Sequence, residues 1–335
     1  MAGTDLKKLA RELNLAVSTV SRALRDSHEI SAATKARVKA LADKYGFRPN
    51  PHASSLRQAK SRTIAVVVPE IRNNFFSQAI NGIELVAQEK GYHVLIYLTH
   101  ENSKQEREVV QLLQNGRADG LLISVTEAES YPHLEACREA ELPIVFFDRV
   151  VDGIDAPRVI TDEKLLAYQT CRRLLESGCE RVAFLTMAGN LSISRHRQDG
   201  YLQALKEKGK EHLSIIVECS AADGDSREQL KKILSGPQRP DAVFAAVEKL
   251  AVDTYEVCTE MGVKIPEDLC VAGFSNLTVA SLFNPPLTTV VQPAYEIGKE
   301  AAGILFRLIE GKKLLPGEQK RVLPSHLEWR RSTAR

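Results

Sequence analysis

The side chains best suited to chemistry lie in two parts of the chain, and the first is a short polar segment near the N-terminus. It carries hydroxyl and guanidinium groups close together, on Ser18, Thr19, Ser21 and Arg22. Hydroxyl groups donate to phosphate oxygens, and a guanidinium can pair bidentately with O6 and N7 of guanine. Side chains of these types are suited to contact with double-stranded DNA. A solvated surface arginine is the alternative interpretation of Arg22.

Two short helices joined by a tight turn would position these groups. Periodicity predicts helices over residues 5–13, 17–25 and 34–45. The apolar side of the second helix consists of Val17, Val20, Ala23 and Leu24. A polar, partly basic second helix after a tight connection is typical of a helix-turn-helix. On periodicity alone, a small three-helix bundle with solvated charges fits equally well.

Net charge differs between the two ends of the chain. Residues 1–62 hold 13 Lys and Arg against 5 Asp and Glu, a net charge of +8, whereas residues 63–335 carry −6. A small cationic module joined to a mildly acidic body predicts a polyanionic partner for one end only.

From Thr63 onward the pattern is that of an α/β body. Short β-branched or aromatic runs alternate with amphipathic stretches, as in a mostly parallel sheet with helices on both faces. The predicted strands are residues 63–69, 93–98, 120–125, 143–148, 181–186, 241–246, 269–274 and 288–291. So many β-α units exceed one open sheet, and we divide them into two lobes near Asp162. Doubly wound sheets bind ligands beyond the carboxyl ends of their strands, so the second candidate site is a cleft there.

Enzyme chemistry has no support in the sequence motifs. The chain has no glycine-rich dinucleotide fingerprint, phosphate loop, nucleophile elbow or zinc-ligand spacing, and its 6 cysteines are scattered singly. His196, between two arginines, is the one tempting catalytic residue, and a pocket or surface role fits it better. We therefore expect no enzyme, no metal and no cofactor, and we expect buried thiols in a reducing compartment.

Targeting features are also missing from the sequence. Charged residues such as Lys7, Lys8 and Arg11 interrupt the N-terminal segment, so it does not read as a signal peptide. The apolar runs are far shorter than the roughly 18 residues of a membrane-spanning helix. We expect a cytoplasmic protein without membrane contact, which argues against a transport binding protein.

Several motifs follow one another in order along almost the whole chain. They include Thr19-Val20-Ser21-Arg22-Ala23-Leu24, Gly46-Phe47-Arg48-Pro49-Asn50, Ser55-Leu56-Arg57, Phe147-Asp148-Arg149, Pro266-Glu267-Asp268 and Pro286-Leu287-Thr288-Thr289-Val290. Together, at these spacings, they resemble the LacI/GalR (lactose-repressor) family of bacterial transcriptional regulators.

This resemblance implies how the N-terminal end contacts DNA. Residues 1–49 would form the helix-turn-helix domain and residues 50–62 a hinge helix with its linker. The implied contacts are Val17, Ser18 and Arg22 at bases, Thr19 and Ser21 near phosphates, and Asn50, Ala53 and Leu56 in the hinge. Leu56 would wedge into the minor groove and kink the DNA. Ala16 stands where the family usually has a capping serine, so this helix end should be weaker by about 1 kcal/mol unless Asn14 substitutes.

For residues 63–335 the resemblance implies a periplasmic-binding-protein-like core for effector binding and dimerisation, with two doubly wound parallel sheets. The N-lobe would span about 63–162 and 291–320, and the C-lobe about 163–290 and 321–335. The implied effector-binding residues are Phe75, Phe76, Ser124, Asp148, Arg197, Val247 and Ser275. Phe75 and Phe76 could instead belong to the core of the lobe.

The chain departs from the family where the family usually holds a sugar. Val247-Glu248 replaces an Asn-Asp pair, and Ser275 replaces an aspartate. Arg195 and His196, next to Arg197, would bring positive charge close to the cleft. We therefore expect an effector other than a plain neutral hexose, namely a compound with a carboxylate or phosphate or an unusual glycan product.

The resemblance thus implies a DNA-binding transcriptional regulator, a repressor in carbohydrate metabolism. It would bind a palindromic operator as a homodimer, under allosteric control by a sugar, sugar acid or sugar phosphate. A solute-binding protein or an enzyme on the same α/β fold is the alternative.

Overall fold

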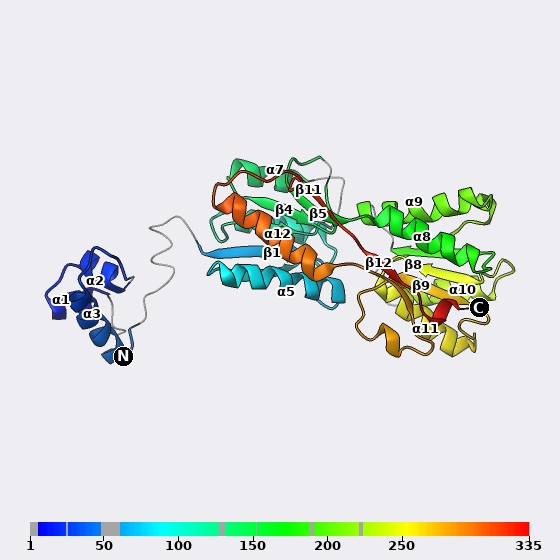
Figure 1. The fold of residues 1–335 in the computed structure, drawn as a ribbon, viewed down its shortest axis with the longest axis horizontal. Coiled ribbons are helices and arrows are strands. Elements are labelled where there is room, and N and C mark those ends of the chain that lie inside the picture. Colours follow the sequence, from blue (N-terminus) through cyan, green and yellow to red (C-terminus); the bar gives the residue numbers. More distant parts are fainter. Residues whose placement is uncertain are drawn as a thin grey trace. The chain divides into compact units, whose positions relative to one another are not determined.

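The structure is a computed structural model that describes residues 6–24, 26–47, 61–126, 131–151, 153–187, 191–220 and 224–334. The chain divides into two compact units, Met1–Ser61 and Arg62–Arg335 (Figure 1). The first unit contains helices only in its described part, and the second contains two β-sheets.

Three helices build the N-terminal unit. They are α1 (Leu6–Leu13), α2 (Val17–Leu24) and α3 (Ala32–Lys44). Each contributes one fully buried side chain, Leu9, Val20 and Val38, to a single small core. The apolar spacing therefore packs the three helices on one another, and all three predicted helices are confirmed.

Local residues set the limits of these helices. Asn14 adopts a positive φ of 52° between α1 and α2, a backbone conformation that Asn tolerates better than most residues. Ser31 caps α3 by accepting a hydrogen bond from the backbone N–H of Thr34 at 3.3 Å. Because of this cap, α3 begins at Ala32 and not at Thr34 as predicted.

The first lobe of the second unit is a six-stranded parallel sheet in the order β11-β5-β4-β3-β1-β2. Its strands are β1 (Thr63–Val68), β2 (His93–Leu98), β3 (Leu121–Ile123), β4 (Ile144–Phe147), β5 (Arg158–Thr161) and β11 (Lys320–Leu323). Its helices are α5 (Asn74–Glu89), α6 (Ser103–Gln114), α7 (Pro132–Glu139) and α12 (Ala294–Ile309).

The second lobe repeats this architecture with the order β12-β10-β9-β8-β6-β7. Its strands are β6 (Val182–Met187), β7 (Ile215–Cys219), β8 (Ala242–Ala245), β9 (Cys270–Phe274), β10 (Thr288–Val291) and β12 (His326–Glu328). Its helices are α8 (Glu163–Glu176), α9 (Ser192–Glu207), α10 (Asp225–Ser235) and α11 (Glu248–Met261), with short 3-10 turns η1 (Glu211–Leu213), η2 (Ala280–Leu282) and η3 (Arg331–Thr333). Only β12 runs antiparallel, against β10.

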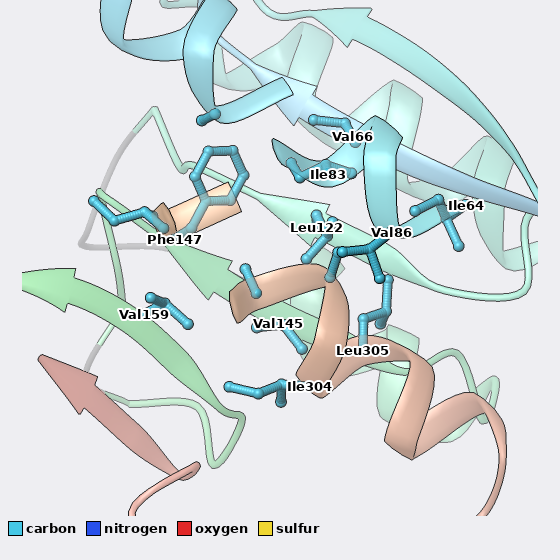
Figure 2. Packing of buried hydrophobic residues seen from close by; sticks show 14 of the residues in the cluster. Ile64, Val66, Ile83, Val86, Leu122, Val145, Phe147, Val159, Ile304 and Leu305 are labelled. Atoms are coloured by element: carbon cyan, nitrogen blue, oxygen red, sulfur yellow. The ribbon is translucent and has the colours of Figure 1, made fainter. Parts of the chain in front are cut away.

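Figure 2 shows the core of the first lobe, where strand and helix side chains interdigitate. Ile64 and Leu122 from the sheet, Ile83 from α5 and Leu305 from α12 are all fully buried in one cluster. Each such side chain contributes about 1.5–3 kcal/mol of hydrophobic stabilisation relative to an exposed one. This burial explains why β1 is a nearly uninterrupted apolar run.

Helices α5 and α12 lie in backbone contact because small residues face one another. A Cβ atom at Gly82 would collide with the carbonyl oxygen of Tyr295, and one at Gly298 would collide with the carbonyl oxygen of Ala79. Alanine at either position would have to push the two helices apart.

All eight predicted strands are present. Four further strands, β5, β7, β11 and β12, escaped prediction. The predicted pair of doubly wound sheets is confirmed, with β12 as the antiparallel exception.

The chain passes between the lobes beside Asp162, after β10, and again after β11. Asp162 caps α8 by accepting from the N–H of Leu165 at 3.1 Å. The final return to the C-lobe, expected at about residue 321, comes a few residues later, after Leu323. β11 pairs in parallel with β5, from Lys320 opposite Arg158 to Leu323 opposite Thr161, so it belongs to the first lobe.

The six cysteines are buried and form no disulfide bond, as expected from their single spacing. Within the described ranges, no helix is both long and apolar enough to cross a membrane.

Candidate functional site

The first candidate site is the outer face of α2. Val17, Ser18 and Arg22 are exposed on this helix, whereas Thr19 and Ser21 are half-buried. Val17 is 40% exposed, so the prediction that it belongs to the apolar side of the helix is wrong. Its exposure does fit the implied position of Val17 on the outward face. The helix thus presents an aliphatic, a hydroxyl and a guanidinium side chain, a set that can contact thymine methyl groups, phosphates and guanine.

Arg22 has a partner that the sequence patterns did not indicate. Its Nη1 lies 2.8 Å from Oε2 of Glu29, which follows α2 in the turn before α3. Both side chains are about half exposed, so the pair is stabilising by at most about 1 kcal/mol. Glu29 therefore holds the guanidinium in place without burying it.

The start of α2 has the predicted weak cap. The backbone N–H of Val20 donates to the carbonyl oxygen of Ala16 at 3.1 Å, so Ala16 occupies the N-cap position with only a methyl group. The implied hinge residues Asn50, Ala53 and Leu56 lie outside the described residues.

The second candidate site is a cleft between the two lobes of Arg62–Arg335. It encloses a cavity of about 40 Å³, room for little more than water. The lining residues are Asn73, Phe75, Phe76, Asp148, Arg149, Ile193, Arg197, Val247, Glu248, Phe274, Ser275, Asn276 and Gln292. They come from the carboxyl ends of strands in both sheets and from α5 and α9, as the physics of doubly wound sheets predicts.

The predicted effector residues gather at this cleft. Phe75 and Phe76, at the start of α5, contact each other edge to face with ring centroids 5.3 Å apart. Both are almost fully buried, so they belong to the lobe core and to the cleft wall at once. Ser124 does not line the cavity, but its hydroxyl donates to Asp148 at 3.2 Å. Whether these residues hold an effector stays a prediction.

Asp148 forms the floor in an unusual setting. It is buried, has a positive φ of 61° directly after β4, and lies 3.8 Å from Nε of Arg149. Burial raises the pKa of Asp148 to about 6, against the smaller opposing effects of Arg149 and Arg197. The carboxyl group is thus still mostly ionised at neutral pH and can accept hydrogen bonds from a ligand.

Arg197 is held from several sides. Its Nε donates to Glu163 at 2.5 Å, Nη1 donates to the carbonyl oxygen of Ala246, and the guanidinium lies 3.9 Å from the ring centroid of Phe274. Nη2 also lies 3.4 Å from Oε1 of Gln292. Arg197 is therefore a neutralised, fixed part of the cleft wall.

Of the three cations that suggested an anionic effector, Arg197 lines the cleft and the other two do not. Arg195 and His196 are exposed on α9 and do not line the cavity. Arg149 donates to both carboxylate oxygens of Glu101, at 2.7 and 3.0 Å. The two guanidinium groups that line the cleft, Arg149 and Arg197, are thus both paired with carboxylates, and a carboxylate or phosphate on the effector stays a prediction.

Glu248 is the cleft residue whose role the sequence did not reveal. Its carboxylate accepts from Nδ2 of Asn74 in the first lobe at 2.9 Å, and from Oγ of Ser275 and the N–H of Asn276 in the second lobe, at 3.0 and 3.1 Å. Gln78 adds a second cross-lobe contact, to the carbonyl oxygen of Asn276 at 3.3 Å. The departures from the family pattern at 248 and 275 therefore compensate one another. Ser275 is shorter than the usual aspartate, and Glu248, longer than an aspartate, brings a carboxylate within hydrogen-bond distance of it.

Within the described ranges, no group of three or more His, Cys, Asp and Glu side chains is arranged to hold a metal ion. The cleft is a polar binding site between lobes, and α2 is an outward-facing polar helix on a separate small unit.

Two family models match these units. The model described as bacterial regulatory proteins of the lacI family covers residues 5–50, and the one described as periplasmic binding proteins and sugar binding domain of LacI family covers residues 61–325. The chain belongs to the LacI family. This LacI-family protein is a DNA-binding transcriptional regulator with an effector-binding domain.

Relatives match along the full length. The chain is 32% identical over 334 residues to the HTH-type transcriptional repressor CytR of Escherichia coli K12, covering 98% of this chain and 96% of CytR. A solved complex of the transcriptional regulator CelR with cellobiose is 26% identical, with a TM-score of 0.72 and coverage of 98% and 99% of the two chains. The Lac repressor dimer bound to operator shares the fold, with a TM-score of 0.83 at 22% identity.

Proposed function

We propose that this LacI-family regulator is a cytoplasmic repressor and not an enzyme, and that it binds a palindromic operator as a homodimer. The observation that carries the proposal is the outward face of α2, with Val17, Ser18 and Arg22 exposed on a unit separate from the one that holds the inter-lobe cleft. Arg22 would read guanine, and the half-buried Thr19 and Ser21 would contact phosphates. Asn50, Ala53 and Leu56 would extend the contact into the minor groove.

Exposed apolar side chains support the homodimer. β2 is an edge strand of its sheet, and its Leu95 and Ile96 are 40% and 46% exposed. In the second lobe, Val279, directly before η2, and Leu282, at its end, are also exposed. An apolar edge strand is a liability unless it is covered. A second copy of the chain would cover it, and the dimer would place one helix-turn-helix unit on each half of a palindrome.

Control would come from a sugar or sugar derivative in the cleft. Phe75, Phe76, Asp148, Arg197, Val247 and Ser275 would surround it, and Ser124 would orient Asp148. An effector can shift operator affinity only by binding more tightly to one arrangement of the lobes than to another. The cross-lobe contacts of Glu248 and Gln78 provide such a difference, because a ligand larger than the present cavity must break them.

The test is selection of DNA from a randomised pool by the purified full-length protein, followed by titration of the selected duplex. We expect an inverted repeat. Arg22→Ala should weaken binding about 10- to 100-fold and relax the preference for one base, since a bidentate contact contributes about 1–3 kcal/mol. Arg239→Ala, which removes an exposed arginine of the body, is the matched control. Selection of no consensus, or equal affinity for the two variants, would contradict the proposal.

A further inference from the structure

The two units of the chain join between Ser61 and Arg62, and Arg62 has an unusual backbone conformation. Its φ is 52°, in the left-handed region that residues other than Gly, Asn and Asp rarely adopt. Because the residue is exposed, the contacts of its peptide groups, and not burial of its side chain, account for this conformation.

Asp119 and the start of β2 hold the backbone of Arg62. Its N–H donates to Oδ2 of Asp119 at 3.0 Å, and its carbonyl oxygen accepts from the N–H of His93 at 2.9 Å. The N–H of Asp119 in turn donates to the carbonyl oxygen of Thr63 at 2.8 Å. Asp119 lies just before β3, which pairs with β1 on the side opposite to β2. The last residue before β1 is thus fixed from both neighbouring strands.

Asp119 is itself held by the core of the first lobe. The hydroxyl of Tyr92 forms a hydrogen bond with Asp119; burial first, and then the charge and the hydrogen bond of Asp119, raise the pKa of Tyr92 to about 12. The ring of Tyr92 packs edge to face against Phe306 of α12, with ring centroids 5.0 Å apart. Asp119 is therefore a firmly placed support for Arg62.

The second lobe repeats this aspartate without an attached unit. Asp241, directly before β8, accepts from the backbone N–H groups of Glu180 and Arg181 at 2.8 and 2.9 Å, just before β6. β8 lies beside β6 as β3 lies beside β1, and both aspartates are half-buried. Arg181, however, has no positive φ, and the chain before it belongs to α8 of the same lobe. An aspartate at this place supports the start of a strand in either lobe, but in the first lobe it also holds the residue to which the helical unit is joined.

We propose that Asp119 is a positioning residue for operator recognition, which fixes the direction in which the chain leaves the first lobe and so sets the half-site spacing that the dimer binds. The inference rests on the proposed function, since it requires a homodimer on a palindrome. Each protomer would hold its helix-turn-helix unit by a tether, the segment that ends at Arg62. A fixed direction of both tethers favours one separation of the half-sites, whereas tethers free to rotate accept several.

The tether is short enough for its direction to matter. Leu56, proposed to enter the minor groove, lies six residues before Arg62, and such a segment spans at most about 20 Å. The half-sites of a palindrome lie about 34–36 Å apart, centre to centre. A segment of this length cannot compensate for a large change of direction at Arg62.

The experiment measures binding of the full-length protein to its selected operator and to duplexes with one or two base pairs added or removed at the centre. Each base pair rotates one half-site by about 35° relative to the other. The wild type should prefer one spacing. Asp119→Ala should bind that spacing about 10- to 100-fold more weakly and should bind the other spacings almost equally well. Asp119→Ala with the spacing preference of the wild type would overturn the proposal.

Asp241→Ala is the matched control, because it removes the same carboxylate from the equivalent place in the second lobe. It should lower the free energy of unfolding about as much as Asp119→Ala does, yet it should keep the spacing preference of the wild type. Equal loss of this preference in both variants would overturn the proposal, since weakened strand ends alone would then explain it.

Arg62→Pro tests the tether even if Asp119→Ala proves unstable. Proline has no N–H to donate to Asp119 and cannot adopt a positive φ, so the spacing preference should again be lost. Arg62→Ala removes the same charge but retains the N–H, and it should keep the preference. Equal preferences in Arg62→Pro and Arg62→Ala would overturn the role of the bond between Arg62 and Asp119.

The same titrations separate this inference from the proposed function. Selection of no inverted repeat contradicts the proposed function. An inverted repeat that the wild type and Asp119→Ala bind with the same dependence on spacing contradicts the role of Asp119 alone.

Discussion

The pairing of Glu163 with Arg197 makes a quantitative prediction about the second lobe. The two side chains are only 5% and 4% exposed, and Nε lies 2.5 Å from the carboxylate. Glu163 also accepts from Nε2 of Gln292 at 2.8 Å and from the hydroxyl of Thr161. Glu163→Gln keeps the size and most hydrogen-bonding capacity of the side chain, but it leaves the buried guanidinium without a counter-charge.

The expected cost follows from this burial. Removing one partner of a buried ion pair costs about 3–5 kcal/mol, because the remaining charge stays out of water. An exposed carboxylate far from such a network should change the free energy of unfolding by no more than about 0.5 kcal/mol. Glu218→Gln, on the exposed side of β7, provides that comparison.

Urea unfolding followed by fluorescence measures the difference. The chain has a single tryptophan, Trp329, which packs against the core of the second lobe and lies 4.4 Å from the Arg173 guanidinium. Its emission therefore reports on the lobe that contains the pair.

We expect the unfolding midpoint of Glu163→Gln to fall well below that of Glu218→Gln. The double variant Glu163→Gln with Arg197→Gln should recover part of the loss, because no buried charge remains unpaired. A midpoint for Glu163→Gln equal to that of the control would refute the view of Arg197 as a charge that depends on Glu163.

Three further predictions concern charge. On logarithmic axes, operator affinity should fall linearly with salt concentration, with a slope set by the number of phosphates that residues 1–62, of net charge +8, neutralise. An affinity that does not change with salt in anisotropy titrations would contradict phosphate binding by this segment. Glu29→Gln should raise operator affinity up to about 5-fold at low salt, because it frees Arg22 and removes a charge that repels DNA. Weaker binding by this variant would contradict the expectation and would mean that Glu29 orients Arg22 for DNA contact. Because burial raises the pKa of Asp148 to about 6, the folded state holds this proton more tightly than the unfolded state, and its contribution to stability is lost as pH rises through 6. The side chain of Asp148→Asn does not titrate, so the free energy of unfolding of this variant minus that of the wild type should fall by about 1.4 kcal/mol from pH 7.5 to pH 5. A difference that stays constant in urea titrations at the two pH values would contradict the raised pKa.

Much of the fold could be predicted because the central strands are buried on both faces. β1, β4 and β8 are continuous apolar runs, and such runs leave a clear signal in the sequence. β11 and β12 lie at sheet edges, where exposed Lys320, Arg321 and His326 interrupt the pattern. β5 begins with Arg158 and ends with Thr161, so its aliphatic run consists of Val159 and Ile160 alone.

The cleft was located correctly, but its electrostatics could not be predicted from the sequence. The general position follows from the carboxyl ends of the strands, whatever the side chains are. The pairing of Arg197 with Glu163, 34 residues apart, and of Asn74 with Glu248, 174 residues apart, depends on how the lobes fold and meet. Neither separation matches a helical or strand period, so local patterns carry no trace of it.

The outward face of α2 shows the same division. Helical periodicity identified α2 and its buried Val20 and Ala23. It could not reveal that Glu29 would turn back toward Arg22, because this contact spans the turn between α2 and α3.

Coupling between the cleft and DNA is tested most directly by the affinity of the wild-type protein for its selected operator, with and without a saturating sugar that stabilises it. If the cleft and the helix-turn-helix unit are two sites of one allosteric regulator, a saturating sugar should change operator affinity by about 5- to 150-fold. The operator should then change sugar affinity by the same factor. Operator affinity that stays the same at zero and saturating sugar would contradict this coupling.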